Sequence, residues 1–326
     1  MKKIIALVTG GNSGEYEISV KSGHNIYRLL NSDLFKVYLI FLKGFDFEYT
    51  DENGIKYAVD KNDFSLKLPS ETVRFDAVFI AIHGTPGEDG KLQSYFDLLN
   101  MPYTGCDAFI SALTFNKNYC NRVVKSYGIR VADSVHLIRH QPYSPDGIIE
   151  TCGLPCFVKP CNSGSSVGMS KVNKMEELIP AIALAFEYDD QVLVERFIAG
   201  REITCGCLKI QGEIVCLPIT EICSKKDFFD YEAKYNAHLC DEITPAPLSQ
   251  HVAEECRKTT TFLYQKLNAR GVVRIDYIFT ETEELYFLEI NTIPGQTNES
   301  IIPKQVACQG LSLENLYTEL IYEALK

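Results

Sequence analysis

Short apolar runs, separated by segments with helical spacing, dominate the first third of the chain. Three runs that are apolar almost throughout lie at 3–8 (KIIALV), 37–41 and 77–82. Runs of this kind are typical of strands buried on both faces of a parallel sheet. Helical segments at 19–30 and 91–99 follow two of the runs, and 46–59 has the pattern of a hairpin turning at Asn53-Gly54. The pattern predicts an open α/β sheet with a hairpin insertion.

Apolar alternation returns after residue 150 and indicates two further units that mix strands and helices. Residues 155–172 have the pattern of a strand, a loop of small residues and a returning strand, and further segments with strand character lie at 191–198, 202–209, 272–279 and 285–291. Helical spacing predicts helices at 175–186 and 249–268, the second with Ser249 as its N-cap. The connection 223–248 is expected to be a loop, and one of this length inside a compact domain is usually functional, such as a lid.

The last two predicted strands carry charged and amide side chains on one face. Because strand side chains alternate, Arg274 and Asp276 share a face, and so do Glu289 and Asn291. Pairing of the strands would gather all four into one patch. Carboxylate and amide oxygens suit Mg²⁺, which takes its other ligands from water and substrate phosphates, and an arginine suits a developing negative charge. The alternative for these strands alone is a solvated polar face on an edge hairpin.

Three loops rich in small residues are candidate ligand sites: 9–17 (TGGNSGEYE), 83–90 (HGTPGEDG) and 161–168 (CNSGSSVG). The first lacks the GxGxxG spacing, so it is a weak dinucleotide-binding motif. The second follows a strand, at the edge where open α/β sheets bind ligands, although a hydrogen-bonded structural role is the alternative for His83. The third offers backbone N–H groups to phosphate oxygens with Lys159 at its base; a flexible surface loop is the alternative.

Composition and charge exclude several classes of function. The 326 residues include 32 Lys+Arg and 43 Asp+Glu, and the net charge of −11 argues against a nucleic-acid partner. No apolar run approaches the roughly 20 residues of a membrane-spanning helix, and no signal peptide precedes the first strand. We therefore expect a cytoplasmic protein with no membrane partner. The 12 cysteines lack zinc-site spacing and are expected to be reduced structural thiols.

The order of these motifs resembles that of the D-alanine–D-alanine ligases, a family with the ATP-grasp fold. The resemblance rests on HGTPGEDGKLQ, GSSVG, VE…GRE, DYEAKY, RID and LEIN-T-x-PG, and covers residues 10–303. It implies an N-terminal α/β substrate domain with an open parallel sheet, followed by two α+β domains that hold ATP between them. The expected bounds are 1–115, 116–205 and 206–326. The chain departs from the family at Phe115-Asn116, where Met-Asp is usual, and at Gln296, where Met is common.

The resemblance also implies a reaction and a set of residues. ATP would phosphorylate the carboxylate of the first D-alanine, and the amine of the second would displace the phosphate. The implied catalytic residues are Glu15, Ser165, Tyr235, Arg274 and Gly295. The implied substrate-binding residues are His83, Ser300 and Ile301. The implied ATP-binding residues are Lys117, Lys159, Glu195, Arg196, Phe197, Ile198, Glu202 and Lys234. Two Mg²⁺ ions, or Mn²⁺, would bind Asp276, Glu289 and Asn291.

Other functions remain open at this point. The nearest alternative is a ligase whose second substrate is D-serine or D-lactate; Tyr235 favours D-alanine, because depsipeptide-forming relatives carry a His there. An ATP-binding module without catalysis is a second alternative, and Arg274 counts against it, since a pure binder needs no oxyanion donor. A nicotinamide dehydrogenase is excluded by the missing GxGxxG. The resemblance further implies a homodimer that acts on D-alanine for peptidoglycan precursor synthesis.

Overall fold

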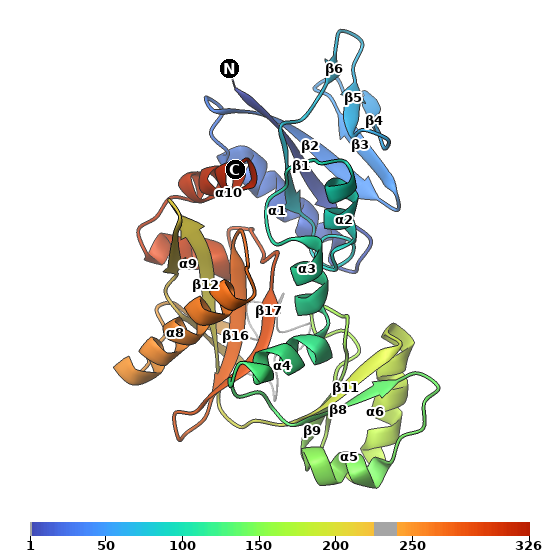
Figure 1. Cartoon of the computed structure of the whole chain (residues 1–326), viewed down its shortest axis with the longest axis vertical. Helices are drawn as coiled ribbons and strands as arrows, with labels where there is room; N and C mark the ends of the chain where they lie inside the picture. Colours follow the sequence, from blue (N-terminus) through green and yellow to red (C-terminus); the bar gives the residue numbers. More distant parts are fainter. Residues whose placement is uncertain (1, 225–239) are drawn as a thin grey trace.

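The structure is a computed structural model that describes residues 2–224 and 240–326. It contains three sheets, each with its own helices, and Figure 1 shows them as an N-terminal unit (blue), a central unit (green to yellow) and a C-terminal unit (orange to red). This is the predicted class, α/β followed by α+β. None of the helices in the described segments is both long and apolar enough to cross a membrane.

The N-terminal sheet has seven strands in the order β6-β5-β4-β3-β2-β1-β7. They are β1 (Lys3–Gly10), β2 (Phe35–Lys43), β3 (Asp46–Thr50), β4 (Lys56–Asp60), β5 (Ser65–Lys67), β6 (Thr72–Val73) and β7 (Ala77–Ala81). β1 runs parallel to β2 and β7, whereas β3 to β6 continue the sheet in antiparallel fashion. The predicted parallel strands and the hairpin insertion are confirmed, and β5 and β6 were not anticipated.

Helices cover both faces of this sheet, because successive residues of β1 point to opposite sides. Ile5 and Leu7 pack with α1 (Tyr16–Leu29) and with the last helix, α10 (Leu313–Ala324). Ala6 and Val8 belong to the cluster that contains α2 (Lys91–Leu98). The C-terminal helix therefore completes the N-terminal core and ties the two ends of the chain together (Figure 1).

Two helices lead from the N-terminal unit to the central one. Asp107 caps α3 (Ala108–Phe115) and Asn116 caps α4 (Lys117–Ser126), each through a side-chain oxygen that accepts a backbone N–H. Residues of both helices lie in the apolar cluster of the C-terminal sheet. The expected boundary at 115/116 falls at the turn between these two helices.

The central unit is an antiparallel sheet in the order β10-β9-β11-β8 with two helices. The strands are β8 (Ser134–Ile138), β9 (Cys156–Pro160), β10 (Ser170–Val172) and β11 (Gln191–Arg196); the helices are α5 (Pro145–Cys152) and α6 (Met175–Tyr188). One apolar cluster joins both helices to the sheet. Because β9 and β10 form a hairpin, the loop between them projects from the sheet at the edge that faces α4.

The C-terminal sheet has the order β15-β14-β12-β16-β17, with β13 also paired to β12. Its strands are β12 (Arg201–Ile210), β13 (Glu213–Cys216), β14 (Thr220–Ser224), β15 (Cys240–Ile243), β16 (Val273–Phe279) and β17 (Leu285–Asn291). It also carries α8 (Gln250–Lys266), capped by Ser249 as expected, and α9 (Ile301–Cys308). The expected boundary at 205/206 falls inside β12. Residues 240–243, expected as loop, form a strand that pairs with β14.

Candidate active site

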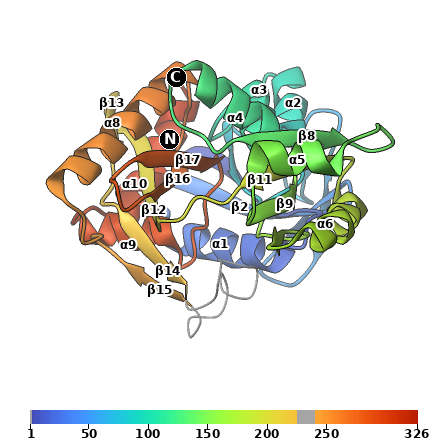
Figure 2. The ribbon, with the colours of Figure 1, turned by 90° about the horizontal axis from the view of Figure 1, so that it is seen from below.

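Two neighbouring cavities lie where the three units meet. The larger, about 670 Å³, is bordered by α1, the β9–β10 loop and the C-terminal sheet. Figure 2 shows α1 between the central and C-terminal units on this side of the molecule. The smaller, about 410 Å³, lies between the central and C-terminal sheets. Residues that line both are Lys117, Ser163, Ser165, Glu202, Ile222 and Glu289. The two cavities are thus halves of one cleft.

Every predicted site residue within the described segments lines this cleft. The larger cavity holds Glu15, His83, Arg274, Asp276, Asn291, Gly295, Ser300 and Ile301. The smaller holds Lys159, Glu195, Arg196, Phe197 and Ile198. Lys117, Ser165, Glu202 and Glu289 line both. Lys234 and Tyr235 lie outside the described residues.

The β16–β17 hairpin gathers the four polar residues whose shared face the alternation predicted. Arg274 lies opposite Asn291 in the register, and Asp276 lies opposite Glu289. A β-bulge follows immediately, between Asp276 and Tyr277. Directly opposed residues have Cβ atoms about 4.5–5.5 Å apart, so four polar groups share one patch. The expected pairing of the two strands is confirmed.

Arg274 and Asp276 form a buried, two-pronged ion pair within this patch. Nε donates to Oδ1 at 2.9 Å and Nη2 donates to Oδ2 at 2.8 Å. The Thr204 hydroxyl, from β12, donates to the same carboxylate at 2.5 Å, and Asp276 is 3% exposed. Burial alone would lower the pKa of Arg274, but the charge and hydrogen bonds of Asp276 outweigh burial, and the pKa is raised overall. The guanidinium therefore stays charged and fixed in direction.

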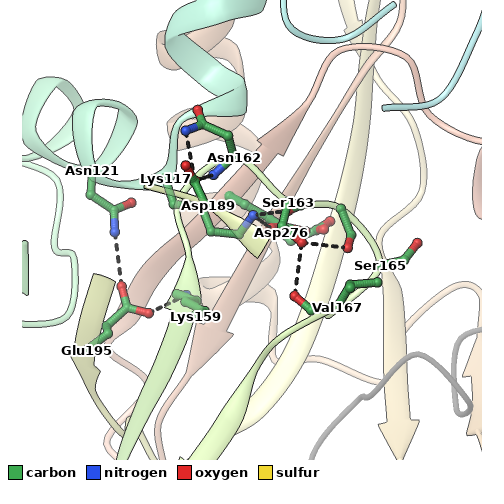
Figure 3. A network of polar contacts seen from close by, with 12 residues as sticks. Lys117, Asn121, Lys159, Asn162, Ser163, Ser165, Val167, Asp189, Glu195 and Asp276 are labelled. Atoms are coloured by element: carbon green, nitrogen blue, oxygen red, sulfur yellow. Dashed lines mark hydrogen bonds and ion pairs between the residues drawn. The ribbon is translucent and has the colours of Figure 1, made fainter. Parts of the chain in front are cut away.

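Lys117 connects α4 to both sides of the cleft. Its Nζ donates to the carbonyl of Ser163 in the β9–β10 loop at 2.5 Å and lies 3.9 Å from the carboxylate of Glu289 on β17. Ser163 in turn donates to the carbonyl of Val167, which folds the loop back on itself (Figure 3). A lysine thus lies between the loop and the acidic hairpin, where phosphate oxygens could replace its present partners.

Glu15 and Ser165 join the N-terminal and central units. Glu15 is the N-cap residue of α1, and the Ser165 hydroxyl donates to its Oε1 at 2.5 Å. Ser165 and Ser166 have φ of 49° and 58°, a left-handed backbone that few L-residues adopt. A Cβ on Gly164 would lie 2.6 Å from Glu15 Oε2, so a larger residue here would displace the Glu15 carboxylate from its present position.

Lys159 and Glu195 form a second buried ion pair, in the smaller cavity. Nζ of Lys159 lies 2.5 Å from Oε2 of Glu195, and Asn121 of α4 donates to Oε1 at 3.0 Å (Figure 3). Burial alone would lower the pKa of Lys159, but the Glu195 carboxylate raises it. Lys159 therefore stays charged, and the pair is oriented from β9, β11 and α4. Asn121 was not predicted, because an asparagine on a helix carries no local signal of its partner.

His83 lines the larger cavity, but protein groups occupy both of its ring nitrogens. Nδ1 lies 2.8 Å from the carbonyl of Ile293, and Nε2 lies 2.9 Å from the hydroxyl of Ser22. Because a carbonyl only accepts, Nδ1 carries the proton and Nε2 accepts from Ser22. Burial lowers the pKa of His83, which keeps the ring neutral. In this structure the ring connects the N-terminal unit to the turn after β17.

Glu88, in the same loop as His83, is a buried acid that the sequence reasoning did not select. It is 8% exposed and lines the larger cavity. Oε2 accepts the Gly84 N–H at 2.8 Å, while Oε1 has no hydrogen-bond partner among the described residues. Burial, followed by the charge of Glu15, raises the pKa of Glu88 to about 8. An acidic residue inside a Gly-rich loop after a buried strand was the available signal.

The turn after β17 leads to the start of α9 on the same side of the larger cavity. The Ser300 hydroxyl accepts the Thr297 N–H at 3.1 Å and lies 2.8 Å from the Thr297 hydroxyl. A Cβ on Gly295 would lie 2.7 Å from Ser300 Oγ, so the turn closes on the helix start because residue 295 is glycine. Gly295, Ser300 and Ile301 together place backbone N–H groups and the positive helix end beside the hairpin.

Comparison with known families agrees with this arrangement. The family model described as D-ala D-ala ligase N-terminus matches residues 4–106, and that described as D-ala D-ala ligase C-terminus matches residues 123–322. The chain belongs to the D-alanine–D-alanine ligase family. It is 44% identical to the D-alanine–D-alanine ligase of Parabacteroides distasonis, over 100% of this chain and 98% of that protein. The corresponding ligase of Phocaeicola vulgatus is 45% identical, with 98% and 99% covered.

Solved structures share the whole fold, which confirms the expected ATP-grasp architecture. The VanG D-Ala:D-Ser ligase from Enterococcus faecalis has a TM-score of 0.87 at 32% identity, covering 99% of this chain and all of that one. D-alanyl-alanine synthetase A from Vibrio cholerae has a TM-score of 0.89 at 30% identity, with 99% and 98% covered. A ligase from Bacillus anthracis in complex with ATP has a TM-score of 0.78 at 25% identity, with 99% and 97% covered. Members of the D-alanine–D-alanine ligase family are ATP-dependent enzymes that form a C–N bond, and ATP is a substrate here too.

Proposed function

We propose that this chain joins two molecules of D-alanine through an acyl phosphate made with ATP, to supply peptidoglycan precursor synthesis. The observation that carries the proposal is the meeting of three groups in one cleft. These are the Arg274–Asp276 pair on the hairpin, the Glu15–Ser165 pair between two units, and Lys117 between loop and hairpin. An amino acid, its activated carboxylate and a triphosphate need these charges side by side.

The smaller cavity fits the nucleotide. Arg196, the last residue of β11, and the next two residues, Phe197 and Ile198, would offer backbone groups to the adenine. Glu195 would lie near its amino group and Glu202 near the ribose. Lys159 and Lys117 would contact phosphate oxygens, each exchanging its present partner for a phosphate. Lys234, by resemblance, would serve the terminal phosphate.

The donor set on the hairpin fits Mg²⁺. Asp276, Glu289 and Asn291 supply two carboxylates and one amide oxygen, all hard ligands, and leave positions for water and phosphate oxygens. When bound, the ions would offset charge on the phosphates during transfer. The protein's own contribution is geometric: Thr204 and Arg274 hold the Asp276 carboxylate in one orientation before any ligand arrives.

The first D-alanine would lie between α1 and the hairpin. Glu15 would bind its ammonium group, with Ser165 and, by resemblance, Tyr235 completing the contact. Arg274 and the Gly295 N–H would stabilise the negative charge that develops on the carboxyl oxygen. Preorganised donors of this kind contribute roughly 3–4 kcal/mol each in comparable acyl transfers.

The second D-alanine would bind by its carboxylate at the start of α9, through Ser300 and the Ile301 N–H. Its amine then attacks the acyl phosphate carbon and phosphate leaves. His83 would line the same space as a neutral wall, because both of its nitrogens are occupied. Closure of the cleft would keep water from the acyl phosphate.

A ligase for D-alanine and D-serine is the second and less favoured candidate: the VanG D-Ala:D-Ser ligase shares this fold at 32% identity, below the 44% of the Parabacteroides distasonis D-alanine–D-alanine ligase. The test is phosphate release from Mg-ATP with D-alanine, D-serine, D-lactate and L-alanine offered singly and in pairs, with products identified by mass. D-alanine alone should support release and give the dipeptide. Release that needs D-serine or D-lactate as well would favour the second candidate, and no release with any of them would refute both.

Three finer points belong to the same proposal. We expect dependence on Mg²⁺, with Mn²⁺ as a substitute, a homodimer and a cytoplasmic location. Chelation should abolish phosphate release and added Mg²⁺ should restore it. Light scattering of the purified chain should give twice the 36.7 kDa of one chain. A monomer with full activity would remove the homodimer from the proposal without affecting the chemistry.

A further inference from the structure

A cluster of four cysteines lies on the far side of the C-terminal sheet from the hairpin patch. Cys205 and Cys207 of β12 and Cys256 of α8 are 0% exposed, and Cys216 of β13 is partly exposed. Cys205 and Cys207 face α8 because alternate residues of β12 share a face, while Thr204 faces Asp276. The cluster therefore shares a strand with the active site but lies outside it.

Cys207 and Cys216 are a directly opposed cross-strand pair. The register of the antiparallel β12–β13 hairpin pairs these two residues, and their sulfur atoms lie 3.9 Å apart. Opposed residues in antiparallel strands have Cα atoms about 4.5–5.5 Å apart, which falls within the range of disulfides. Closing the gap to an S–S bond of about 2.0 Å needs side-chain rotation and little backbone movement.

The two thiols differ in access and in acidity. Cys216 borders two surface hollows beside α8, both of which are also lined by Arg257. Hydrogen bonding between Cys216 and the thiols of Cys205 and Cys207 lowers the pKa of Cys216, and the charge of Arg257 acts in the same direction. Cys207 lies beneath, buried, and the pKa of its thiol is raised. The thiol of Cys216 is thus partly exposed and has a lowered pKa, and the thiol of Cys207 is buried 3.9 Å from it.

We propose that Cys216 is a peroxide-sensitive thiol and that Cys207 resolves its oxidised form as a reversible cross-strand disulfide. The Cys216 thiolate attacks hydrogen peroxide, the O–O bond breaks, and sulfenic acid and hydroxide form. Cys207 loses its proton and attacks the sulfenic sulfur, and hydroxide leaves and is protonated to water. The balance is two thiols and one peroxide giving one disulfide and two waters.

Two features favour a disulfide over the other uses of clustered thiols. Within residues 2–224 and 240–326, no group of three or more His, Cys, Asp or Glu side chains is arranged to hold a metal ion. The other pairs in the cluster are not opposed in a strand register: Cys205 lies opposite Ile275 of β16, and Cys256 is on a helix. The geometry therefore selects one pair.

The expected consequence is protection of the thiol rather than loss of catalysis. The hairpin is already closed by its turn at Gln211-Gly212, so a bond between its strands adds little constraint to Asp276 on the opposite face. Without Cys207, the sulfenic acid on Cys216 would proceed to the sulfinic and sulfonic acids, which thiol reductants do not reverse. Cys207 thus converts an irreversible lesion into a reversible one.

The test treats the purified chain with hydrogen peroxide in a Cys308→Ser background, which removes the most exposed cysteine among those whose side chains the structure describes. Peptide mapping by mass should show a linked pair of peptides containing residues 207 and 216, a loss of two hydrogens, and recovery with dithiothreitol. D-alanine-dependent phosphate release should change less than about twofold between oxidised and reduced protein. In Cys207→Ala, peroxide should instead add two or three oxygens to Cys216, and dithiothreitol should not remove them.

Two outcomes would overturn the inference. The first is recovery of Cys207 and Cys216 as free thiols in the Cys308→Ser chain under peroxide conditions that oxidise Cys308 in the unsubstituted chain. The second is irreversible oxidation of Cys216 in the parent at the same rate as in Cys207→Ala. Cys256→Ala is the matched control, since it removes a buried thiol of the cluster without touching the opposed pair, and it should form the disulfide as the parent does.

Discussion

The two walls of the cleft are built in different ways. On the hairpin wall, β16 and β17 present Arg274, Asp276, Glu289 and Asn291 through strand alternation and register. On the loop wall, the β9–β10 connection presents Ser165 through a left-handed backbone and through contacts with α1 and α4. The hairpin wall is positioned by regular structure within one unit, whereas the loop wall is positioned by meeting other units.

This difference determines what a substitution should do on each wall. The Arg274–Asp276 pair and Thr204 hold one another within the C-terminal sheet, so exchanging a ligand there should change chemistry and leave geometry intact. On the loop wall, Glu15 is the N-cap residue of α1 and Lys117 begins α4, and both contact the β9–β10 loop. A small substitution in that loop should therefore displace the side chains that meet it.

Glu289→Gln should have the largest effect. The exchange keeps size and strand register but removes a charge from the proposed metal site, so turnover should fall by at least about 1,000-fold as several kcal/mol of transition-state stabilisation are lost. The thermal midpoint should move little. Phosphate release and circular dichroism measure the two effects, and near-normal turnover would remove Glu289 from the metal site. Glu284→Gln, half-exposed just before the same strand, is the matched control and should keep full activity.

Gly164→Ala should have the next largest effect, through geometry. The new Cβ would lie 2.6 Å from Glu15 Oε2, so the carboxylate or the loop must shift. Misplacement by about 1 Å can cost 100-fold, and we expect kcat/KM for D-alanine to fall about 10- to 100-fold. The loss should lie mainly in KM for the first D-alanine.

The matched control is Gly147→Ala in α5, where a Cβ would meet Ser144 at an ordinary 3.5 Å. It should keep wild-type kinetics, and alanine should slightly favour the helix. Wild-type kinetics in Gly164→Ala as well would show that Glu15 is not held against the loop in solution.

The same contrast explains what could be predicted from the sequence. Period-two alternation is local, so it placed Arg274 and Asp276 on one face and required only that two neighbouring strands pair. The contact of Ser165 with Glu15 joins residues 150 positions apart, and only the family resemblance placed the two in one set of catalytic residues. No local pattern encodes a left-handed serine or the partners of His83.

Missed elements of the fold divide along the same line. β15 exists because β14 offers it an edge, which is information from a distant part of the chain. α5 was missed although Ser144-Pro145 is a local start signal, an N-cap followed by proline at the first helical position, and the Ser144 hydroxyl does accept the Gly147 N–H. β15 could not be predicted from local sequence, whereas the start of α5 could have been.

Glu88→Gln tests the loop that holds His83 and should appear in the pH dependence of stability. The folded protein keeps a proton on Glu88 up to pH of about 8, because its pKa is raised, while the unfolded chain loses that proton near the ordinary value of 4.5. The unfolded state therefore binds fewer protons between these values, and this group makes stability fall as pH rises from about 4.5 to 8. Glutamine stays neutral in both states and removes that fall.

Denaturant unfolding of the parent and Glu88→Gln at pH 6 and pH 8 measures the effect. Between pH 6 and pH 8, the unfolding free energy of Glu88→Gln minus that of the parent should increase by roughly 2 kcal/mol. Glutamine can still accept the Gly84 N–H, so the loop should keep its shape. A difference that is constant with pH would mean that Glu88 is ionised in the folded protein at pH 6.

Asn121→Ala should have the smallest effect and separates support of the cleft from its chemistry. Asn121 donates to Glu195, and its removal leaves Lys159 to hold that carboxylate alone. We expect a loss of about 1–2 kcal/mol of unfolding free energy and a rise of a few fold in KM for ATP, with kcat unchanged. Asn118→Ala on the same helix is the comparison: Asn118 Oδ1 accepts from Arg122 Nε at 3.2 Å and does not contact Glu195, so stability should fall without a change in KM. If KM for ATP were unchanged in Asn121→Ala as well as in Asn118→Ala, α4 would stabilise the fold without orienting the nucleotide site. The orientation of Glu195 would then come from β11 and Lys159 alone.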